Sequence, residues 1–465
     1  MAYLGIAVHA APQVLEIHAI APRWSVKASN RAIAQGPWWK TLNDAILSEV
    51  IELGLASNPD MEAAYGRLDV AKASTIVALA GLVPSTSFDL TTSGQPGSVV
   101  FRCAVGPITP EELESFSNPT MENDGLCFTG SALFNFRWGL DVFGEGILKH
   151  RSARFEAEAA RQDRSAIRLL VSGSIASAYL DALSAAQKVT ILVDQLDAQS
   201  TLLELLERRY EMGAATGLDV LQQRQAVAST QASLPLVRLS ADSQLRVLAA
   251  LMGAGLDDIP RLPNVLPGPP PPPTIGTPTD LISRRPDLVA ARSRVTAAKA
   301  RRRSSVRSLL PKVSMNANVG WTYALADDLS TLETFGIGGA FTVPLFNGGL
   351  GVAELRSAQG TYRTVVSAYN TALLNAVRDV ENGVIRDREL ATRHEAVKAQ
   401  VVAVRSAFEE AKQRYLQGLD TFLAVLTAQA DLQRAEVSLV DALRDRLAAR
   451  TQLLTALGGD TGGSR

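Results

Sequence analysis

Residues 132–142 read Ala-Leu-Phe-Asn-Phe-Arg-Trp-Gly-Leu-Asp-Val, and this stretch decides how the rest of the chain is interpreted. Apolar side chains alternate there with polar or small ones, which is the period of a β-strand. The same alternation occupies residues 313–323 and 334–345, and a shorter version surrounds Phe88 and Leu90. The sequence therefore predicts four strands, each with one apolar face and one small or polar face.

Two kinds of sheet show this alternation, one half-buried against helices in a soluble protein and one facing lipid. Three of the four strands run about ten residues, the length that a tilted transmembrane strand needs. Trp138, Trp321 and Tyr323 lie near strand ends, where an aromatic girdle would meet the membrane surface. We favour the lipid-facing sheet and keep the soluble sheet as the alternative.

An internal repeat organises the sequence. The motif Asn-Pro-Asp at 58–60 recurs as Arg-Pro-Asp at 285–287, an offset of 227 residues. The motif Arg-Tyr-x-x-Gly at 209–213 recurs at 414–418, an offset of 205 residues. The smaller second offset means that the first half carries about 22 extra residues, which we place between 98 and 125.

Long helices follow each strand pair. Between Val366 and Tyr415 apolar residues recur in alternating steps of three and four, the spacing of a coiled coil. A helix over 350–417 would be on the order of 100 Å long at about 1.5 Å per residue, and residues 147–212 should match it. Helices of this length suit a tube or stalk and not a compact enzyme.

These patterns predict a mainly α-helical chain with β-strands, built from a duplicated unit of helix, strand pair and long helical hairpin. We expect an irregular N-terminal segment at 1–37, a first repeat at 38–259, a proline-rich linker at 260–279, a second repeat at 280–459 and a tail at 460–465. The strand pairs are expected at about 85–143 and 312–346, and the hairpins at about 147–253 and 350–457.

Composition excludes several classes of protein. The chain has 465 residues with 46 Lys and Arg against 47 Asp and Glu, so it lacks the basic excess that attracts nucleic acid. It contains no uninterrupted run of about 18 apolar residues, so no helix is expected to span a membrane. Two cysteines and four scattered histidines do not suggest a zinc site, and no nucleophile with its base is evident. We therefore expect no catalytic residue, metal or cofactor.

Four transmembrane strands cannot close a barrel, and open strand edges are not tolerated in lipid. The barrel must therefore be shared between chains. Three copies would supply twelve strands, although counting alone also permits two or four copies.

Four sequence features together resemble the TolC family of outer-membrane efflux proteins, and most closely its OprM/NodT branch. They are the Leu-Ile-Ser-Arg-Arg-Pro-Asp-Leu stretch at 281–288, the Phe-Thr-Val-Pro-Leu-Phe-Asn-Gly-Gly stretch at 341–349, the paired Arg-Tyr-x-x-Gly turns, and Trp38-Trp39. The resemblance implies a homotrimer in the outer membrane of a Gram-negative bacterium. A twelve-strand barrel in the lipid would continue as a twelve-helix periplasmic α-barrel. This duct would passively conduct drugs or other small molecules from an inner-membrane resistance-nodulation-division pump and a periplasmic adaptor.

The resemblance also assigns roles to the two hairpin turns, which it places at the periplasmic end. Leu416 and Asp420 match the apolar and carboxylate positions of the family's pore constriction, with Arg414 as a counter-charge. An Asp in a solvated turn is the alternative for Asp420. The adaptor-contacting tips would be formed by Gly213, Thr216, Gly217, Leu218, Gly418, Leu419 and Thr421.

The chain departs from the OprM pattern at its N-terminus. Members of that branch usually follow a signal peptide with a lipid-bearing cysteine, yet here the first cysteine is Cys103 and the first basic residue is Arg23. If the longer loop between Cys103 and Cys127 is extracellular, a disulfide closing it is plausible, and two unpaired thiols are the alternative.

Two other functions are compatible with parts of the pattern. An outer-membrane duct for type I protein secretion would share the whole architecture, although the Arg-Arg-Pro-Asp motif and the proline-rich linker favour small-molecule efflux. A soluble coiled-coil scaffold would keep the heptads but has no use for four strands with an apolar face. Arg-Arg-Pro-Asp itself also resembles a helix start, since Pro286 suits the first turn and Asp287 the positive end of the dipole.

Overall fold

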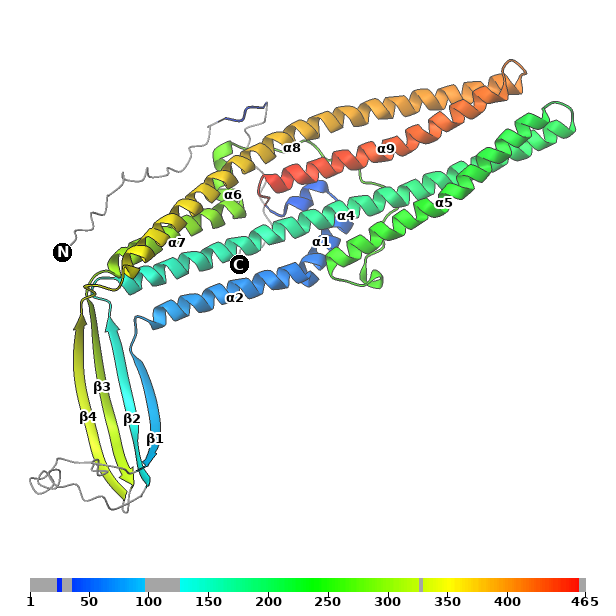
Figure 1. Cartoon of the computed structure of the whole chain (residues 1–465). Coiled ribbons are helices and arrows are strands. Elements are labelled where there is room, and N and C mark those ends of the chain that lie inside the picture. Colours follow the sequence, from blue (N-terminus) through cyan, green and yellow to red (C-terminus); the bar gives the residue numbers. More distant parts are fainter. Residues whose placement is uncertain (1–22, 27–35, 97–125, 326–328, 460–465) are drawn as a thin grey trace, which may run out of the picture. The chain divides into compact units, whose positions relative to one another are not determined.

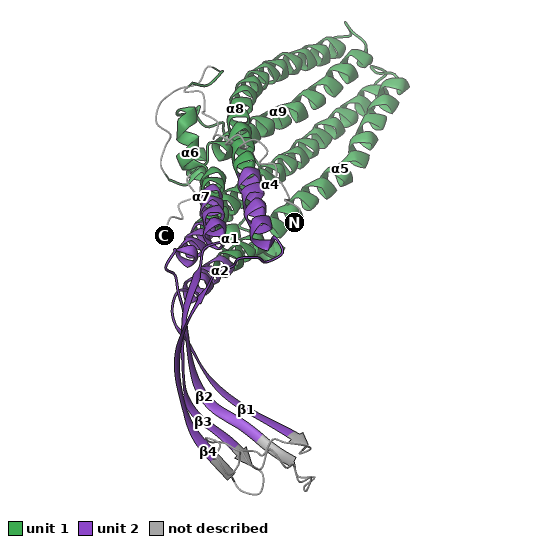
Figure 2. Cartoon of the chain, turned by 60° about the vertical axis from the view of Figure 1, so that its left-hand side comes forward, with its two compact units in different colours: residues 1–69, 158–292, 366–465 green, residues 70–157, 293–365 purple. Residues whose placement is uncertain are grey.

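The computed structural model describes residues 23–26, 36–96, 126–325 and 329–459. The chain divides into two compact units (Figure 2). Unit 1 comprises residues 1–69, 158–292 and 366–465, and unit 2 comprises residues 70–157 and 293–365. Each unit draws segments from both halves of the sequence, so neither unit coincides with one of the expected repeats. Cys103 lies outside the described residues, as do most of 1–37 and all of 460–465.

The same order of elements occurs twice along the chain (Figure 1). The first series is α2 (Pro59–Ala80), β1 (Ser85–Pro96), β2 (Leu126–Leu140), α4 (Glu145–Glu211) and α5 (Gly217–Met252). The second is α7 (Pro286–Arg307), β3 (Lys312–Leu325), β4 (Leu329–Thr342), α8 (Leu350–Leu416) and α9 (Phe422–Ala456). Helices α4 and α8 are both 67 residues long, and α2 and α7 are both 22. The helices predicted at 147–212 and 350–417 are confirmed to within two residues at each end.

Short elements complete the chain. They are η1 (Trp38–Leu42), α1 (Ala45–Ser57), η2 (Leu256–Asp258), η3 (Pro278–Asp280) and α6 (Leu281–Arg284). Between η2 and η3 the proline-rich linker has no helix or strand, as its prolines predict. It is nonetheless held in place, because Arg450 Nη1 donates to the Pro270 carbonyl at 3.1 Å and Arg450 Nε pairs with Asp387 Oδ1 at 2.8 Å.

Unit 2 contains an antiparallel sheet in the order β1-β2-β3-β4. The pairing places Phe88, Phe134, Val319 and Phe335 opposite one another across all four strands. More than half of each of these side chains is exposed. The neighbouring positions, which face the other side, are small or polar except for Leu133, and Asn135 Nδ2 there donates to Asp89 Oδ2 at 2.7 Å. The predicted apolar face is therefore confirmed, and no part of the chain that the structure describes covers it.

The main hydrophobic core lies in unit 1. The adjacent tryptophans Trp38 and Trp39 are both almost fully buried in it, and Trp38 Nε1 donates to Ser172 Oγ at 3.1 Å. Helix α4 contributes much of the rest of the core and includes one 18-residue window apolar enough to cross a membrane by length and composition. The sequence still contains no uninterrupted run of about 18 apolar residues, so this window does not contradict the expectation. Since 67% of the window is buried within the chain, it is explained by core packing.

The repeated Pro-Asp motifs hold equivalent helix ends within unit 1. Asn58 Nδ2 donates to the Leu251 carbonyl at 2.7 Å, near the end of α5, and Arg285 Nη1 donates to the Ala456 carbonyl at 3.1 Å, at the end of α9. Because the last carbonyls of a helix have no partner inside it, both side chains act as C-terminal caps. The Arg-Arg-Pro-Asp motif therefore has a structural role in this fold.

Candidate functional site

The two helical hairpins of unit 1 end in turns of the same geometry (Figure 1). Gly213 (φ +71°) separates α4 from α5, and Gly418 (φ +75°) separates α8 from α9. Residues with side chains rarely adopt this left-handed conformation, so glycine is the natural residue at both turns. In each turn the backbone N–H that follows the glycine donates back to the carbonyl of the arginine in the Arg-Tyr-x-x-Gly motif. The distances are 2.7 Å to Arg209 and 2.9 Å to Arg414.

The helices that leave the two turns begin differently. At the start of α5, Thr216 Oγ1 accepts from the Asp219 N–H at 3.2 Å, and Asp219 Oδ2 accepts from the Thr216 N–H at 3.1 Å. This reciprocal capping box satisfies two free N–H groups. Thr421 makes no such side-chain cap at the start of α9, and its N–H instead donates to Asp420 Oδ1 at 2.8 Å.

A hydrophobic cluster joins the two hairpins immediately behind the turns. We call it the tip cluster, and it consists of Leu202, Leu206, Val220, Tyr415, Phe422 and Val425. At its edge the Tyr415 hydroxyl donates to Asp219 Oδ2 at 3.0 Å, a bond from α8 to α5. The Tyr415 and Phe422 rings pack with their centroids 5.2 Å apart. The tip cluster therefore holds the first hairpin against the second.

Electrostatics strengthens this connection. Burial and the Asp219 carboxylate together raise the pKa of Tyr415 from 10.0 to about 12, so the hydroxyl keeps its proton near neutral pH. The Arg209 guanidinium lies 5.7 Å from the centre of the Tyr415 ring and donates to the Leu416 carbonyl at 3.4 Å. Cation–π contact and hydrogen bonding thus add a second connection between α4 and α8.

The residues that the resemblance assigned to the constriction lie at the second turn. Arg414 Nε and Asp420 Oδ2 are 3.4 Å apart, so the expected counter-charge is present. Leu416 is half-buried and packs against the tip cluster. Leu419 at the second turn and Leu218 just after the first turn are 65% and 64% exposed. Both turns therefore present an apolar side chain to their surroundings.

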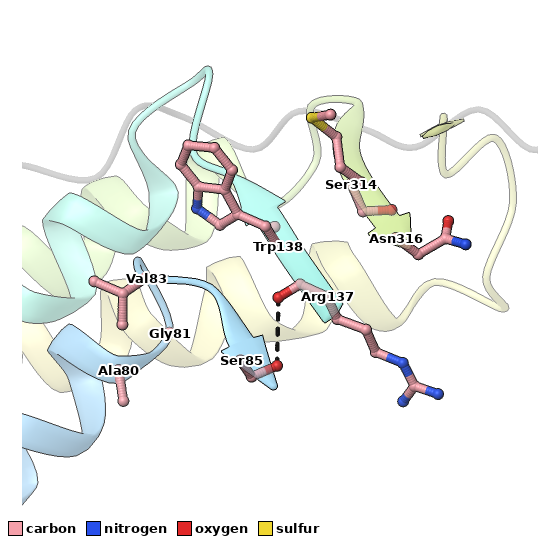
Figure 3. Close-up of a pocket in the computed structure, with 10 residues that line it drawn as sticks. Ala80, Gly81, Val83, Ser85, Arg137, Trp138, Ser314 and Asn316 are labelled. Atoms are coloured by element: carbon pink, nitrogen blue, oxygen red, sulfur yellow. Dashed lines mark hydrogen bonds between the residues drawn. The ribbon is translucent and has the colours of Figure 1, made fainter. Parts of the chain in front are cut away.

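Two hollows accompany these features. One of about 500 Å³ lies between α8 and α9 beside the second turn and is lined by Val404, Ala407, Thr421, Leu423, Ala424 and Thr427, with Ala428 and Asp431. The other, of about 290 Å³, lies in unit 2 where α2 meets β1, and there Ser85 Oγ donates to the Arg137 carbonyl at 3.3 Å (Figure 3).

Across the described part of the chain, no three His, Cys, Asp or Glu side chains are grouped to hold a metal ion.

Sequence reasoning assigned Tyr415 only to helix packing and did not single out Asp219 or Arg209. One signal was present in the repeat. Tyr210 and Tyr415 correspond to each other, but the counterpart of Asp219 is Ala424. Accordingly Tyr210 is 54% exposed while Tyr415 is buried. Asp219 has no carboxylate counterpart in the second repeat, and this difference indicated that only Tyr415 would find a carboxylate on the other hairpin.

Comparison with known sequences gives a consistent result. The profile of the family described as "Outer membrane efflux protein" matches residues 50–254 and 277–459. The Pseudomonas putida protein named pyoverdine export outer membrane protein OpmQ is 29% identical over 442 residues, which cover 92% of this chain and 89% of that protein. Outer membrane protein OprJ of Pseudomonas aeruginosa is 25% identical and covers 95% of this chain and 90% of its own.

Solved structures share the fold over nearly the whole chain. The outer membrane protein VceC of Vibrio cholerae aligns with a TM-score of 0.76 and 27% identity, over 91% of this chain and 98% of that one. The outer-membrane channel OprN aligns with a TM-score of 0.80 and 22% identity, over 97% and 99%.

Proposed function

The chain belongs to the outer membrane efflux protein family, and from this premise we propose that three copies form one duct that conducts small molecules out of the cell. Proteins of this family lie in the outer membrane of Gram-negative bacteria, and efflux is the function of the chain. The proposal concerns how many copies assemble, what passes through them and where the duct closes.

The observation that carries the proposal is the sheet of unit 2. It has four strands, an exposed apolar face, and an outer edge on β1 and on β4 that no described strand pairs with. Unpaired backbone groups are too costly in lipid, so the edges must be closed by strands of other copies. Twelve strands from three copies form an even-numbered barrel within the known range. The long helices would continue it as a periplasmic α-barrel of twelve.

Partners follow from the same architecture. A passive duct in the outer membrane needs an energy-coupled transporter in the inner membrane and an adaptor across the periplasm. We infer that a resistance-nodulation-division pump and a membrane fusion protein fill these roles. The exposed Leu218 and Leu419 and the groove beside Thr421 are the surfaces we assign to the adaptor.

The cargo is proposed to be a small organic molecule. Relatives carry names that refer to pyoverdine export and to antibiotic or toluene efflux. All of these compounds are small compared with a protein, so the relatives favour small-molecule efflux over type I protein secretion. No observation on the described residues favours secretion of a polypeptide.

The closed end of the duct is proposed to lie at the hairpin tips. The second turn combines an exposed carboxylate, Asp420, with the half-buried Leu416. Three Asp420 side chains brought near the axis would repel one another unless each is countered by Arg414, so this end is the natural place for a gate. A ring of carboxylates there would also favour cations.

Planar-bilayer conductance of purified protein tests this placement. Replacing both residues in the variant Leu416→Ala/Asp420→Ala should raise single-channel conductance, because the constriction loses its bulk and its charge. The control is Leu218→Ala, which removes an exposed leucine beside the first turn and should conduct like the parent. An unchanged double variant would place the constriction elsewhere in the duct.

A further inference from the structure

Basic residues gather where α7 ends and β3 begins, within unit 2 (Figure 1). From Leu288 to Ala326 the chain contains no aspartate or glutamate. The nearly neutral composition of the whole chain therefore conceals a strong local excess of positive charge. The basic residues of this stretch are Arg292, Arg294, Lys299, Arg301, Arg302, Arg303, Arg307 and Lys312.

Half of the six basic side chains between 299 and 312 are engaged inside the chain. Lys299, Arg301 and Arg303 are exposed, and none of them has an ion-pair partner in the part of the chain that the structure describes. Their charge is therefore available to a partner outside the chain. The other three are held by the Tyr362 ring (Arg302, 4.9 Å to its centre), the Phe143 carbonyl (Arg307) and Glu145 Oε2 (Lys312 Nζ, 3.9 Å).

Two of the available basic residues share one face of α7. Lys299 and Arg303 lie one turn apart, and Val306 follows on the same face in the last turn. We call these three residues the α7 stripe. Val306 is 50% exposed, and Leu310, just beyond the helix, is 39% exposed. The exposed surface thus changes from basic to apolar toward the strand.

The opposite face of α7 has a different character. Arg301 lies two residues from both Lys299 and Arg303, which is about 200° around the helix. It is followed on its own face by Ser305 and Ser308, whose hydroxyls donate to the Arg301 carbonyl at 3.2 Å and the Ser305 carbonyl at 3.0 Å. Hydroxyl groups suit a face in water, whereas the apolar end of the α7 stripe suits a face near lipid.

The first repeat shows which part of this surface is specific to α7. In α2, Ile76 and Leu79 occupy the positions of Arg303 and Val306, and they are 67% and 46% exposed. The same face is therefore exposed in both helices, but only α7 carries a positive charge one turn from the strand. An apolar surface contacts any lipid, and the added charge favours an anionic one.

We propose that the α7 stripe binds the headgroup of an anionic phospholipid in the periplasmic leaflet of the outer membrane. Arg303 would pair with the lipid phosphate through its planar guanidinium, with Lys299 adding charge. Val306 and Leu310 would contact the start of the acyl chains. This inference goes beyond the efflux function and rests only on the outer-membrane location of the family.

The position of Arg303 along the helix fits this role. The headgroup layer on each side of a bilayer is about 5–7 Å thick. Arg303 lies four residues before the end of α7, about 6 Å along the axis, and β3 starts soon afterwards. A long arginine side chain covers such a distance because its stem packs along apolar surface while its charged head reaches the phosphates.

Native mass spectrometry of the full-length, detergent-purified protein tests the proposal. The protein is titrated with phosphatidylglycerol or with phosphatidylcholine of the same acyl chains, and the parent should bind phosphatidylglycerol more tightly. One basic side chain near an anionic surface contributes about fivefold in affinity. Arg303→Gln should therefore weaken phosphatidylglycerol binding about fivefold and leave phosphatidylcholine binding unchanged.

The matched control is Arg301→Gln. It removes the same charge from the same turn of α7, but on the opposite face, so it should bind both lipids like the parent. An excess of inorganic phosphate at constant ionic strength should not displace the lipid, because phosphate makes no contact with Val306 or Leu310.

Three results would overturn the proposal. A parent that binds both lipids equally would leave the basic residues to another partner, such as an acidic protein surface. Equal weakening by Arg303→Gln and Arg301→Gln would indicate a diffuse attraction without a site. Displacement by inorganic phosphate would indicate a site for free anions. The single-channel conductance that tests the duct does not depend on lipid preference, so either proposal can fail alone.

Discussion

Tyr415 joins the two hairpins of the chain at the proposed gate. Its hydroxyl donates to Asp219 on the other hairpin, while its ring packs in the tip cluster. Tyr415→Phe should therefore keep the packing and lose the bond. A hydrogen bond to a charged acceptor in a partly exposed site contributes about 1–2 kcal/mol, which is a five- to thirtyfold shift in a two-state equilibrium. Single-channel recording should show a correspondingly higher open fraction.

The pH dependence of the parent protein provides the control. Because the pKa of Tyr415 is raised from 10.0 to about 12 in the folded tip, the bond contributes fully below about pH 10 and is lost as the pH approaches 12. The open fraction of the parent should rise over this interval, and that of Tyr415→Phe should not. If both proteins respond alike to alkali, another group holds the tips together.

At the scale of the helix ends, two glycines with the same backbone conformation should respond differently to substitution. Gly253, at the end of α5, has φ +65°, and a Cβ there would lie 2.5 Å from the Ser57 carbonyl oxygen. Gly213, at the hairpin turn, has φ +71° and open space around it. Both alanine variants incur backbone strain of about 1 kcal/mol, but only Gly253→Ala adds a clash with backbone.

Thermal unfolding followed by circular dichroism in detergent measures this difference. Gly253→Ala should unfold at a clearly lower temperature than Gly213→Ala, whose midpoint should lie closer to that of the parent. Equal midpoints would mean that a Cβ at position 253 is accommodated beside the Ser57 carbonyl without loss of stability.

At the scale of the strand, adjacent residues of β4 face opposite sides of the sheet. Phe335 lies on the exposed apolar face, and Thr334 lies on the small, polar face with its Oγ1 3.1 Å from Thr322 Oγ1. An arginine on the lipid face of a membrane strand costs about 2–4 kcal/mol near the midplane. Phe335→Arg should therefore reduce folded protein in outer-membrane fractions, whereas Thr334→Arg should be better tolerated. If Thr334→Arg reduced folded protein more than Phe335→Arg, the small, polar face of the sheet would be the one that contacts lipid.

At the scale of the whole molecule, the number of strands per chain limits how many chains can share one barrel. Four strands per chain require partners, and the family's efflux function requires a continuous duct. Native mass spectrometry of detergent-purified protein should therefore find three chains per particle. A stable monomer that needs no detergent would contradict the shared barrel, since its apolar sheet face would then be exposed to water.

The sequence by itself determined the repeat, the helix lengths and the apolar face of the strands. The helices and strands depend on spacing between near neighbours in the chain, which periodicity records directly, and the repeat is visible as recurring motifs. The Arg414–Asp420 pair was also foreseen, because six residues around a tight turn are brought together by local geometry. Only the tertiary structure decided that Tyr415 meets Asp219, 196 positions away, and that Arg209 joins them. Such contacts depend on how the two hairpins pack. The sequence shows that only the first repeat carries a carboxylate at this position, but the packing of the hairpins decides that Tyr415 reaches it.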